Sequence, residues 1–397
     1  MLDACRPDYI TGDKTPFLNA LSRTGLFARL RPTFGFEPDG AYLAGLYPDQ
    51  ADQGAQFWHQ PLSSPFRGMI PNVLAPILDR LPYLPKKVIR KVLTWMVRYR
   101  SASPHLSAAA IPFSLLDRFS LPVRVNLDQP GFCPFPTVFD LLREDRRPYL
   151  FHGAPQYRVT TAAALKRAKT DLVPPLDFAF FHIGNLDGTG HAFGPDTPET
   201  TAELNQVDRD LEQVYNLALD RFDQVHFVVM GDHGMVQVRD HIHLLPDLEN
   251  LPLKPGKDYL YMLDSTMARF WFFTPRAKAV IQAMLEKKKG GRILTQKDRD
   301  QYHLNYSHNK FGDLIFLANP GVMIFPNFFQ EKNPVRGMHG YAPENYGQQA
   351  ALIIQSTLAG SARFEGSLDM RRVFPTLCDL LSLTCPDHSR AKSLVNW

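Results

Sequence analysis

Two short glycine-rich motifs each bring an aspartate and a histidine together in the chain. The first, "NLDGTGHAFGPDT", holds Asp187 and His191 four residues apart, and the second, "GDHGM", holds Asp232 next to His233. Either motif alone has a plainer explanation, namely a capping aspartate and a surface histidine. Carboxylate oxygens and imidazole nitrogens are also the donors that zinc and similar divalent ions take in proteins. Two such motifs in one chain therefore predict a shared metal site.

Two further residues extend this set. His339 lies between Met338 and Gly340 in "RGMHGY". Asp3 lies in "MLDACRPDYI", where a first strand would end. His339 alone would more often be an ordinary loop histidine. Together with the two motifs, these residues make three carboxylates and three imidazoles, which suit two zinc-like ions with open positions. Two ions about 4 Å apart can clamp the attacking and leaving oxygens of a phosphoryl group.

The apolar pattern predicts the elements that would position these motifs. Residues 176–184 and 224–230 are short apolar runs typical of buried parallel strands, and each run ends just before a motif. Between them, residues 201–222 carry apolar side chains at steps of three and four, which predicts an amphipathic helix. Strand, helix and strand at this spacing form a βαβ unit, and ligands bind at the carboxyl ends of such strands. Further helices are predicted at residues 15–25 and 370–383. The expected fold class is α/β, with a mostly parallel central sheet and helices on both faces.

Length and composition indicate one large globular domain with insertions, or two domains. The chain has 397 residues, of which 44% are hydrophobic and 21% charged, and its net charge of +4 does not suggest a nucleic-acid-binding surface. We predict a core formed by residues 1–57, 136–245 and 310–397. The basic, proline-rich residues 58–135 and the residues 246–310, which contain "EKKKGGR", are predicted to be cap insertions.

Six segments, taken in order, carry a family resemblance. "LDACRPDYI", "TPFLNALSRTG", "GLYPD", "LDGTGHAFGP", "GDHGM" and "GMHGY" resemble the alkaline phosphatase superfamily, and within it the type I phosphodiesterase/nucleotide pyrophosphatase family. The resemblance covers the predicted core and implies an alkaline-phosphatase-like fold that binds two metal ions, zinc or alternatively manganese. It implies that one ion is held by Asp187, His191 and His339, and the other by Asp3, Asp232 and His233.

The resemblance also implies a hydroxyl nucleophile on the loop after the first helix. The family pattern is Pro-Thr-x-Thr-Phe-Pro-Asn, with the second threonine transiently phosphorylated. In "RPTFGFEPDG", a count back from "GLYPD" without gaps places Gly35 at the nucleophile position and Thr33 two residues earlier. We predict Thr33 as the catalytic residue, with a metal-bound water as the alternative. Gln56 lies near the position of the family's phosphoryl-binding asparagine and is predicted to bind substrate.

The start of the chain departs from the family pattern, in which the first metal-binding aspartate ends a full strand. Here two residues precede Asp3, so we expect a misassigned or trimmed start, which leaves room for an export signal. The four cysteines show no CxxC spacing, which favours reduced thiols and a cytoplasmic location. No run of about 18 apolar residues predicts a membrane span.

One stretch of the first cap is strongly basic. Residues 80–116 contain no acidic residue, and "KKVIRKVLTWMVRYR", residues 86–100, has apolar side chains at helical spacing. The plainer interpretation is a helix packed on the core with a solvated basic face. The alternative is an interfacial helix that makes peripheral contact with anionic lipid.

These observations together favour a two-metal hydrolase of phosphate esters. The predicted function is a phosphodiesterase of the nucleotide pyrophosphatase type, with a phosphate ester as substrate. Two alternatives stay open at this point. One is an inactive relative that binds metal and a phosphorylated ligand, and the other is a phosphoryl-group transferase.

Overall fold

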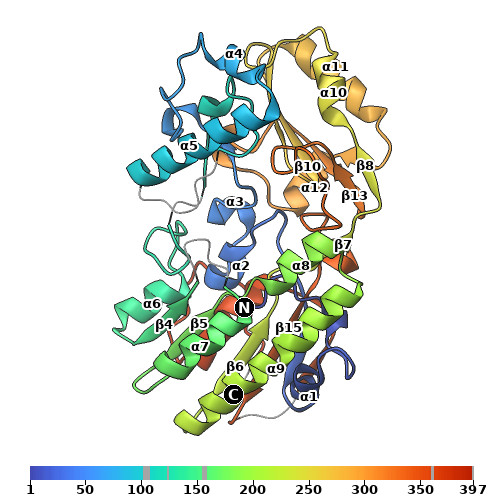
Figure 1. Ribbon diagram of the computed structural model, residues 1–397. Helices are drawn as coiled ribbons and strands as arrows, with labels where there is room; N and C mark the ends of the chain where they lie inside the picture. Colours follow the sequence, from blue (N-terminus) through green and yellow to red (C-terminus); the bar gives the residue numbers. More distant parts are fainter. Residues whose placement is uncertain (102–107, 123–124, 154–158, 359–361, 396–397) are drawn as a thin grey trace.

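The molecule consists of two lobes, one above the other in Figure 1. The computed structural model describes residues 1–101, 108–122, 125–153, 159–358 and 362–395. The lower lobe in this view contains both ends of the chain and a central sheet with helices around it. The upper lobe contains a second sheet and most of the two predicted insertions.

The sheet of the lower lobe is mixed. Its four strands lie in the order β16 (Ala362–Asp369), β1 (Leu26–Arg31), β15 (Ala350–Ser356) and β6 (His226–Met230). β1 pairs in parallel with β16, whereas β15 is antiparallel to both of its neighbours. A separate parallel ladder joins β4 (Tyr149–His152) to β5 (Phe178–Phe181).

The first residues of the chain connect these two groups of strands. The Leu2 N–H donates to the Met230 carbonyl and the Asp3 N–H to the Ile183 carbonyl, both at 2.8 Å. Residues 1–3 therefore lie between β6 and β5, and they place Asp3 at the same sheet edge as the residues that follow these two strands.

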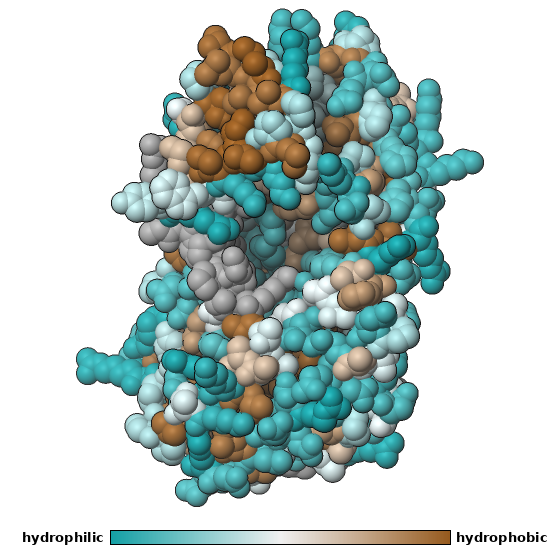
Figure 2. Space-filling model, viewed as in Figure 1, coloured by the Kyte–Doolittle hydropathy of each residue, from teal (hydrophilic) through white to brown (hydrophobic). Residues whose placement is uncertain are grey.

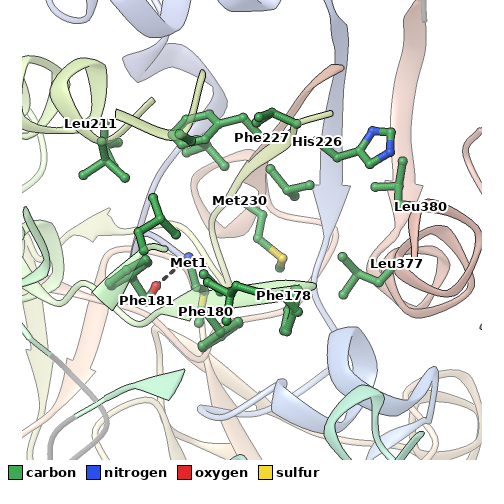
Figure 3. Close-up of a pocket in the computed structure, with 18 of the residues that line it drawn as sticks. Met1, Phe178, Phe180, Phe181, Leu211, His226, Phe227, Met230, Leu377 and Leu380 are labelled. Carbon is green, nitrogen blue, oxygen red and sulfur yellow. Dashed lines mark hydrogen bonds between the residues drawn. The ribbon is translucent and has the colours of Figure 1, made fainter. Parts of the chain in front are cut away.

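A cavity of about 460 Å³ lies beside β5 and β6, and Met1 is among the residues that line it. The amino group of Met1 donates to the Phe181 carbonyl at 2.8 Å. Figure 3 shows this hydrogen bond, with Leu211 and Leu377 among the apolar side chains that line the cavity. None of the six predicted metal-binding residues lines this cavity.

The prediction of a mostly parallel sheet is not confirmed, because two of the four described ladders in this lobe are antiparallel. The cause is the position of β15. The segment that carries His339 lies at the edge where β6 ends, and β15 begins at Ala350, just after that segment. A strand that starts at this edge must run away from it, and so it opposes β6.

Helices cover both faces of this sheet, and the alternation of side chains along β15 shows how. Ala351 and Ile353 pack with α1 (Pro16–Thr24) and α9 (Pro198–Arg221) on one face. Leu352 and Ile354 point to the other face, toward α2 (Asp39–Ala44), α6 (Val138–Glu144) and α13 (Val373–Leu380). This alternation is expected for a strand buried on both sides.

Three predicted helices are present close to their expected bounds. They are α1 and α13 and the helix between the motif strands, α9. α9 begins at Pro198, three residues before the predicted start, and the side chain of Thr197 caps it by accepting from the Thr200 N–H. The apolar stripe of α9 is buried as its spacing predicts, through Leu204, Val207, Leu211, Val214 and Ala218.

The upper lobe contains a fully antiparallel sheet with helices around it. Its strands lie in the order β11 (Gly291–Ile293), β12 (Leu314–Ala318), β10 (Met267–Phe272) and β9 (Tyr259–Leu263). Its helices are α4 (Ala75–Asp79), α5 (Tyr83–Ser101), α10 (Leu244–Glu249), α11 (Pro275–Glu286) and α12 (Gln296–Gln301). One hydrophobic cluster includes Leu93 and Phe119 from the first predicted insertion and Phe270 and Ile281 from the second. The two insertions therefore share a core.

The remaining described α-helices and strands are a helix that packs against α9 and several shorter elements. The helices are α3 (Pro48–Ala51), α7 (Thr161–Asp171) and α8 (Asn185–Phe193). Three two-stranded ladders join β2 (Trp58–His59) to β3 (Phe119–Ser120), β7 (Val236–Gln237) to β14 (Gly337–Met338), and β8 (Asp240–Ile242) to β13 (Val322–Ile324). Within the described ranges, none of the helices combines the length and apolar character needed to span a bilayer.

Candidate metal centre

The end of β6 positions Asp232 and His233 through two close backbone approaches. A side chain on Gly231 would meet the Cys5 carbonyl at 2.6 Å, and one on Gly234 would meet the Gly347 carbonyl at 2.1 Å. Only glycine fits at such contacts, so the chain can bend here immediately before and after the motif. The Asp232 carboxylate accepts the Ala4 N–H at 3.1 Å and the His233 N–H at 2.9 Å, which fixes its orientation.

Asp3 joins these two residues from the N-terminal segment. The Nε2 atom of His233 lies 3.4 Å from an Asp3 oxygen and 3.6 Å from an Asp232 oxygen. All three residues are buried, and each offers one donor atom within 4.8 Å of the others. This group matches one of the two ligand sets that the family resemblance implied.

Asp187 and His191 lie on α8, not on the loop that the glycines suggested. Their separation of four residues puts them on one face of the helix, with Asp187 Oδ1 3.2 Å from His191 Nε2. The other ring nitrogen of His191 lies 2.8 Å from the Gly337 carbonyl, which holds the ring in place. Asp187 is buried, whereas the His191 side chain is 23% exposed.

His339 brings the two motifs together. Its Nε2 atom lies 3.7 Å from Asp187 Oδ1, and its ring stacks on that of His233 with centroids 3.7 Å apart. Asp187, His233 and His339 form a second group with donor atoms within 4.8 Å of one another. His233 thus belongs to both groups, while His191 contacts Asp187. The six residues therefore lie close together, with their donor atoms grouped around His233, and their binding of metal stays a prediction.

The pKa of His233 and the surroundings of its Nε2 atom indicate what kind of ligand this cluster would accept. Burial lowers the pKa of His233, but the charges of Asp232, Asp3 and Asp187 outweigh burial, so the pKa lies above its usual value. Its buried Nε2 atom has no hydrogen-bond partner in the part of the chain that the structure describes. A divalent cation at this point would satisfy that nitrogen and the carboxylates around it, so the donor set fits a metal ion.

The segment between β1 and α2 lies beside this cluster. The Phe36 ring meets the His339 ring edge-on, with centroids 5.8 Å apart. Gly35 has a φ of +116°, and a side chain there would meet the Gly54 carbonyl at 2.2 Å. This conformation therefore leaves no room for a threonine at position 35. Thr33 lies two residues earlier and is partly exposed, and its role as nucleophile stays a prediction.

The predicted substrate-binding residue, Gln56, is exposed in the loop that follows α3. A different glutamine in this loop is buried: the Gln53 side chain accepts the Gly40 N–H at 2.8 Å and so holds the start of α2. Gln53 therefore has a structural part in this loop, and substrate binding by Gln56 stays a prediction.

The sequence analysis missed Asp39, the first residue of α2. Asp39 is buried and accepts a hydrogen bond from the hydroxyl group of Tyr42. Burial, followed by the charges of Asp39, Asp232 and Asp3, raises the pKa of Tyr42 well above its usual value. Tyr42 thus links α2 electrostatically to the Asp3 and Asp232 side of the centre. The feature of the sequence that could have revealed Asp39 is an aspartate at a helix start, in "FEPDGAYLAG".

His182 was also missed. It is buried just beyond β5, with its Nε2 atom 3.4 Å from the second carboxylate oxygen of Asp3. A polar residue in the apolar run "LDFAFFHIG" was the signal that could have revealed it. His182 is placed to orient Asp3 from behind, as outer partners of metal-binding carboxylates do.

Comparison with protein families identifies related chains. A model of the family described as type I phosphodiesterase / nucleotide pyrophosphatase matches residues 91–342. Human ectonucleotide pyrophosphatase/phosphodiesterase family member 5 is 20% identical over 219 residues, which are 54% of this chain and 44% of that protein. Human bis(5′-adenosyl)-triphosphatase ENPP4 is 22% identical over 227 residues, or 53% of this chain and 45% of that protein. The matched region spans less than half the length of either relative.

A shorter match involves a different activity. GPI ethanolamine phosphate transferase 3 of Schizosaccharomyces pombe is 40% identical over 65 residues, which are 16% of this chain and 7% of that protein. Such a segment indicates a related local motif, not an alignment of whole chains.

Solved structures share the fold over nearly the whole chain. Murine ectonucleotide pyrophosphatase / phosphodiesterase 5, in an inactive form in complex with AMP, superimposes with a TM-score of 0.65 at 16% identity. The human protein of the same name gives a TM-score of 0.64 at 14% identity. Both comparisons cover 97% of this chain and 94% of the other chain. At these identities the likeness concerns the fold.

Proposed function

Since the chain belongs to the type I phosphodiesterase / nucleotide pyrophosphatase family, we propose that it is a metal-dependent hydrolase that cleaves phosphate diesters of the nucleotide type. The observation that carries the proposal is the convergence of two donor groups on His233 at one sheet edge. Those groups join residues from widely separated parts of the chain, which local structure alone does not require. The AMP complex of the murine structural neighbour supports nucleotide diesters as the first substrates to test.

Two ions, zinc or manganese, would be held by the six clustered residues. Asp3, Asp232 and His233 would hold one ion, and Asp187 and His339, with His191 beside them, would hold the other. When bound, such ions supply positive charge to phosphoryl oxygens and lower the pKa of an attacking hydroxyl group. A carboxylate-rich donor set is compatible with both zinc and manganese.

The surrounding residues would fix the geometry of the reaction. The Ala4 N–H and His182 orient the Asp232 and Asp3 carboxylates, so these oxygens need no rearrangement when substrate binds. Phe36 covers one edge of His339 and would keep water from that side of the site. The group that attacks phosphorus would be the hydroxyl of Thr33 or a water molecule within the site.

The experiment is hydrolysis by the purified protein, loaded with zinc or manganese. The substrates are an aryl phosphate diester, an aryl phosphate monoester and a dinucleotide. Turnover of a diester that disappears on chelation and returns with metal supports the proposal. No hydrolysis of any of these substrates by a protein that has bound metal stoichiometrically would refute it and favour the inactive relative. The match to a hydrolase family does not favour that alternative.

The nucleophile can be assigned separately with the variants Thr33→Ala and Thr33→Ser. If Thr33 attacks, the alanine variant loses on the order of a thousandfold in kcat and the serine variant retains activity. A quenched diester reaction of the unmodified protein then also contains a covalent adduct, in which the phosphoryl group on Thr33 keeps its second ester substituent, and intact mass detects it. If water attacks, the alanine variant keeps activity within a few fold and no such adduct forms.

Transfer of the phosphoryl-linked group to another alcohol is the second candidate, favoured by the match to the ethanolamine phosphate transferase. Transfer would use the same site as hydrolysis, with an alcohol in place of water as the acceptor of the phosphoryl-linked group. Product analysis in the presence of a simple acceptor alcohol separates the two. Accumulation of a new diester at the expense of hydrolysis identifies a transferase.

A further inference from the structure

Helix α5 has two apolar faces, and only one of them packs against the protein. Leu93 and Val97 are buried in the core of the upper lobe, and Ile89 is partly buried beside them. On the other face, five large side chains are between 50% and 82% exposed: Leu84, Val88, Val92, Trp95 and Tyr99. Their spacing of four, four, three and four residues places them in one stripe along the helix. The apolar side chains that the sequence shows at helical spacing therefore lie on two faces of α5, one buried and one exposed.

The exposed apolar surface continues beyond α5. Val73, Leu74 and Ile77, in and just before α4, are between 47% and 78% exposed, and Leu62 is 83% exposed. Figure 2 shows apolar surface gathered over α4 and α5 at the top of the molecule. Scattered exposed apolar residues are normal on a soluble protein, but a gathered patch of this kind marks an interaction surface. We call it the α4–α5 face.

The charge that borders this face is positive. Lys87 and Lys91 are exposed next to the apolar stripe on α5, and the sequence from Arg80 to Leu116 contains no acidic residue. Lys332, from a distant segment, lies with its amino group 4.0 Å from the centre of the Tyr83 ring and adds to this charge.

Two acidic side chains of this region contact other groups of the protein. The Asp79 carboxylate accepts the N–H groups of Phe113 and Ser114, at 2.6 and 3.1 Å. Glu331 pairs with Arg90 at 2.9 Å on the packed side of α5. The balance of charge at the α4–α5 face is therefore set by its lysines and arginines.

We propose that the α4–α5 face binds the surface of a bilayer that contains anionic lipid. An amphipathic helix with an apolar stripe bordered by lysines lies in the plane of such a surface, with its lysine amino groups at the headgroups. Trp95 and Tyr99, which stack 6.1 Å apart at one end of the stripe, are the residue types enriched at the water–lipid boundary.

Charge argues against a second copy of the chain as the occupant. Two such faces in contact would bring lysines of one copy toward lysines of the other, and like charges in contact oppose association. An anionic bilayer complements both the apolar stripe and its basic border. Binding of this kind needs neither metal nor turnover, so the inference goes beyond the proposed function and is tested separately from it.

The test uses the fluorescence of Trp95 in the full-length protein. Trp58 and Trp271 are 1% and 2% exposed, whereas Trp95 is 67% exposed. A Trp397→Phe background removes the remaining tryptophan. Vesicles of phosphatidylcholine with an equal part of phosphatidylglycerol should shift the emission to the blue, and brominated lipid should quench it. Pure phosphatidylcholine vesicles should bind on the order of tenfold more weakly, and added salt should weaken binding to the anionic vesicles.

Two double variants test the two components of the surface. Val88→Asp with Val92→Asp removes the apolar contact, and Lys87→Glu with Lys91→Glu reverses the border, and each should weaken binding at least tenfold. Leu219→Asp is the matched control, since Leu219 is an exposed leucine on α9 of the other lobe and is 39% exposed. It should bind like the unmodified protein.

Three results would overturn the proposal. One is no fluorescence change with anionic vesicles, and another is binding by both double variants that equals binding by the unmodified protein. The third is a dimer in light scattering that the Val88→Asp, Val92→Asp variant dissociates, which would make a second copy the occupant. Circular dichroism confirms the fold of each variant, and a single Val92→Ser substitution replaces the double variant if that one does not fold.

Discussion

The molecule contains two buried clusters of charge that are neutralised in different ways. In the upper lobe, Asp264 and Arg269 are 1% and 0% exposed, and the guanidinium lies 3.0 Å from the carboxylate. Burial raises the pKa of Asp264, and the Arg269 charge opposes that rise. At the candidate metal centre, three buried carboxylates meet the imidazoles of His233, His339 and His191 instead. An arginine is charged at every physiological pH, whereas an imidazole is charged only when protonated.

The two clusters differ in where their members come from and in how they are held. Asp264 and Arg269 lie five residues apart in the β9–β10 hairpin, and Arg269 also donates to the Phe57 carbonyl at 2.8 Å. Arg269 therefore joins this hairpin to the segment that carries Phe57, and the ion pair helps to hold the fold. The centre gathers its donors from distant chain segments and leaves the Nε2 atom of His233 without a hydrogen bond in the described chain. A cluster whose compensating charge comes from a bound cation can lose that cation and bind it again, whereas an arginine side chain stays in place.

Loss of a central carboxylate should have the largest effect. Asp232→Asn should lower diester hydrolysis on the order of a thousandfold or more, because one donor oxygen of the Asp3, Asp232 and His233 group disappears. Metal content, measured by mass spectrometry of the purified protein, should fall in parallel. Asp264→Asn is the matched control, since it alters a buried aspartate of the other cluster and should leave metal content per folded molecule unchanged. Equal metal content in Asp232→Asn and the unmodified protein would contradict the assignment.

Removal of the buried cation should produce the largest loss of stability. Arg269→Leu leaves the Asp264 carboxylate buried without its partner, which typically costs about 3–5 kcal/mol. The free energy of unfolding in urea measures this loss. The double variant Arg269→Leu with Asp264→Leu should recover much of it, because no uncompensated charge is then left in the core. A single variant within about 1 kcal/mol of the unmodified protein would show that this pair does not determine the stability of the lobe.

A change behind the centre should have an intermediate effect. His182→Phe removes the imidazole 3.4 Å from Asp3 while keeping an aromatic ring in the buried site. Metal affinity should fall about 10- to 100-fold, the range for loss of an outer partner of a ligand. His182→Gln, which can still donate a hydrogen bond from a similar position, should retain more affinity than the phenylalanine variant. Equal affinities for the two variants would indicate that His182 only fills space.

Sequence patterns predicted the strands that end in the motifs and the helix between them. These elements depend on local features: apolar runs for β5 and β6, and a step of three or four along α9. Four of the six donor residues follow these two strands, and the carboxyl ends of parallel strands meet at one edge of a sheet, which predicted that the four lie close together. Those parts of the fold and the site are therefore readable from short stretches of the chain.

Other features depend on contacts between distant segments and could not be read in this way. The antiparallel direction of β15 follows from where the His339 segment lies, and the helical setting of Asp187 and His191 overrides the glycines beside them. Asp39 is linked to the site through Tyr42, and the sharing of His233 between two groups depends on the close backbone approaches at Gly231 and Gly234. Each of these depends on packing that no local pattern contains.

A third charge pair, on the surface, should have the smallest effect and so calibrates the other two. Arg292 contacts both carboxylate oxygens of Asp298, at 2.7 and 2.8 Å, and this contact is the main reason that the pKa of Asp298 lies below its usual 3.8. A carboxylate with a lowered pKa in the folded state adds stability above its unfolded pKa and loses it as the pH falls through the folded value. Because the Arg292 side chain is 46% exposed and water screens its charge, the contribution of the pair should be only about 0.2–1 kcal/mol. The free energies of unfolding of Asp298→Asn and of the unmodified protein should therefore differ by this amount at neutral pH and converge in strong acid.

A difference that persists in strong acid would mean that the substitution does not act through the ion pair. It would then act through the capping of α12 by Thr295, whose hydroxyl group also donates to Asp298.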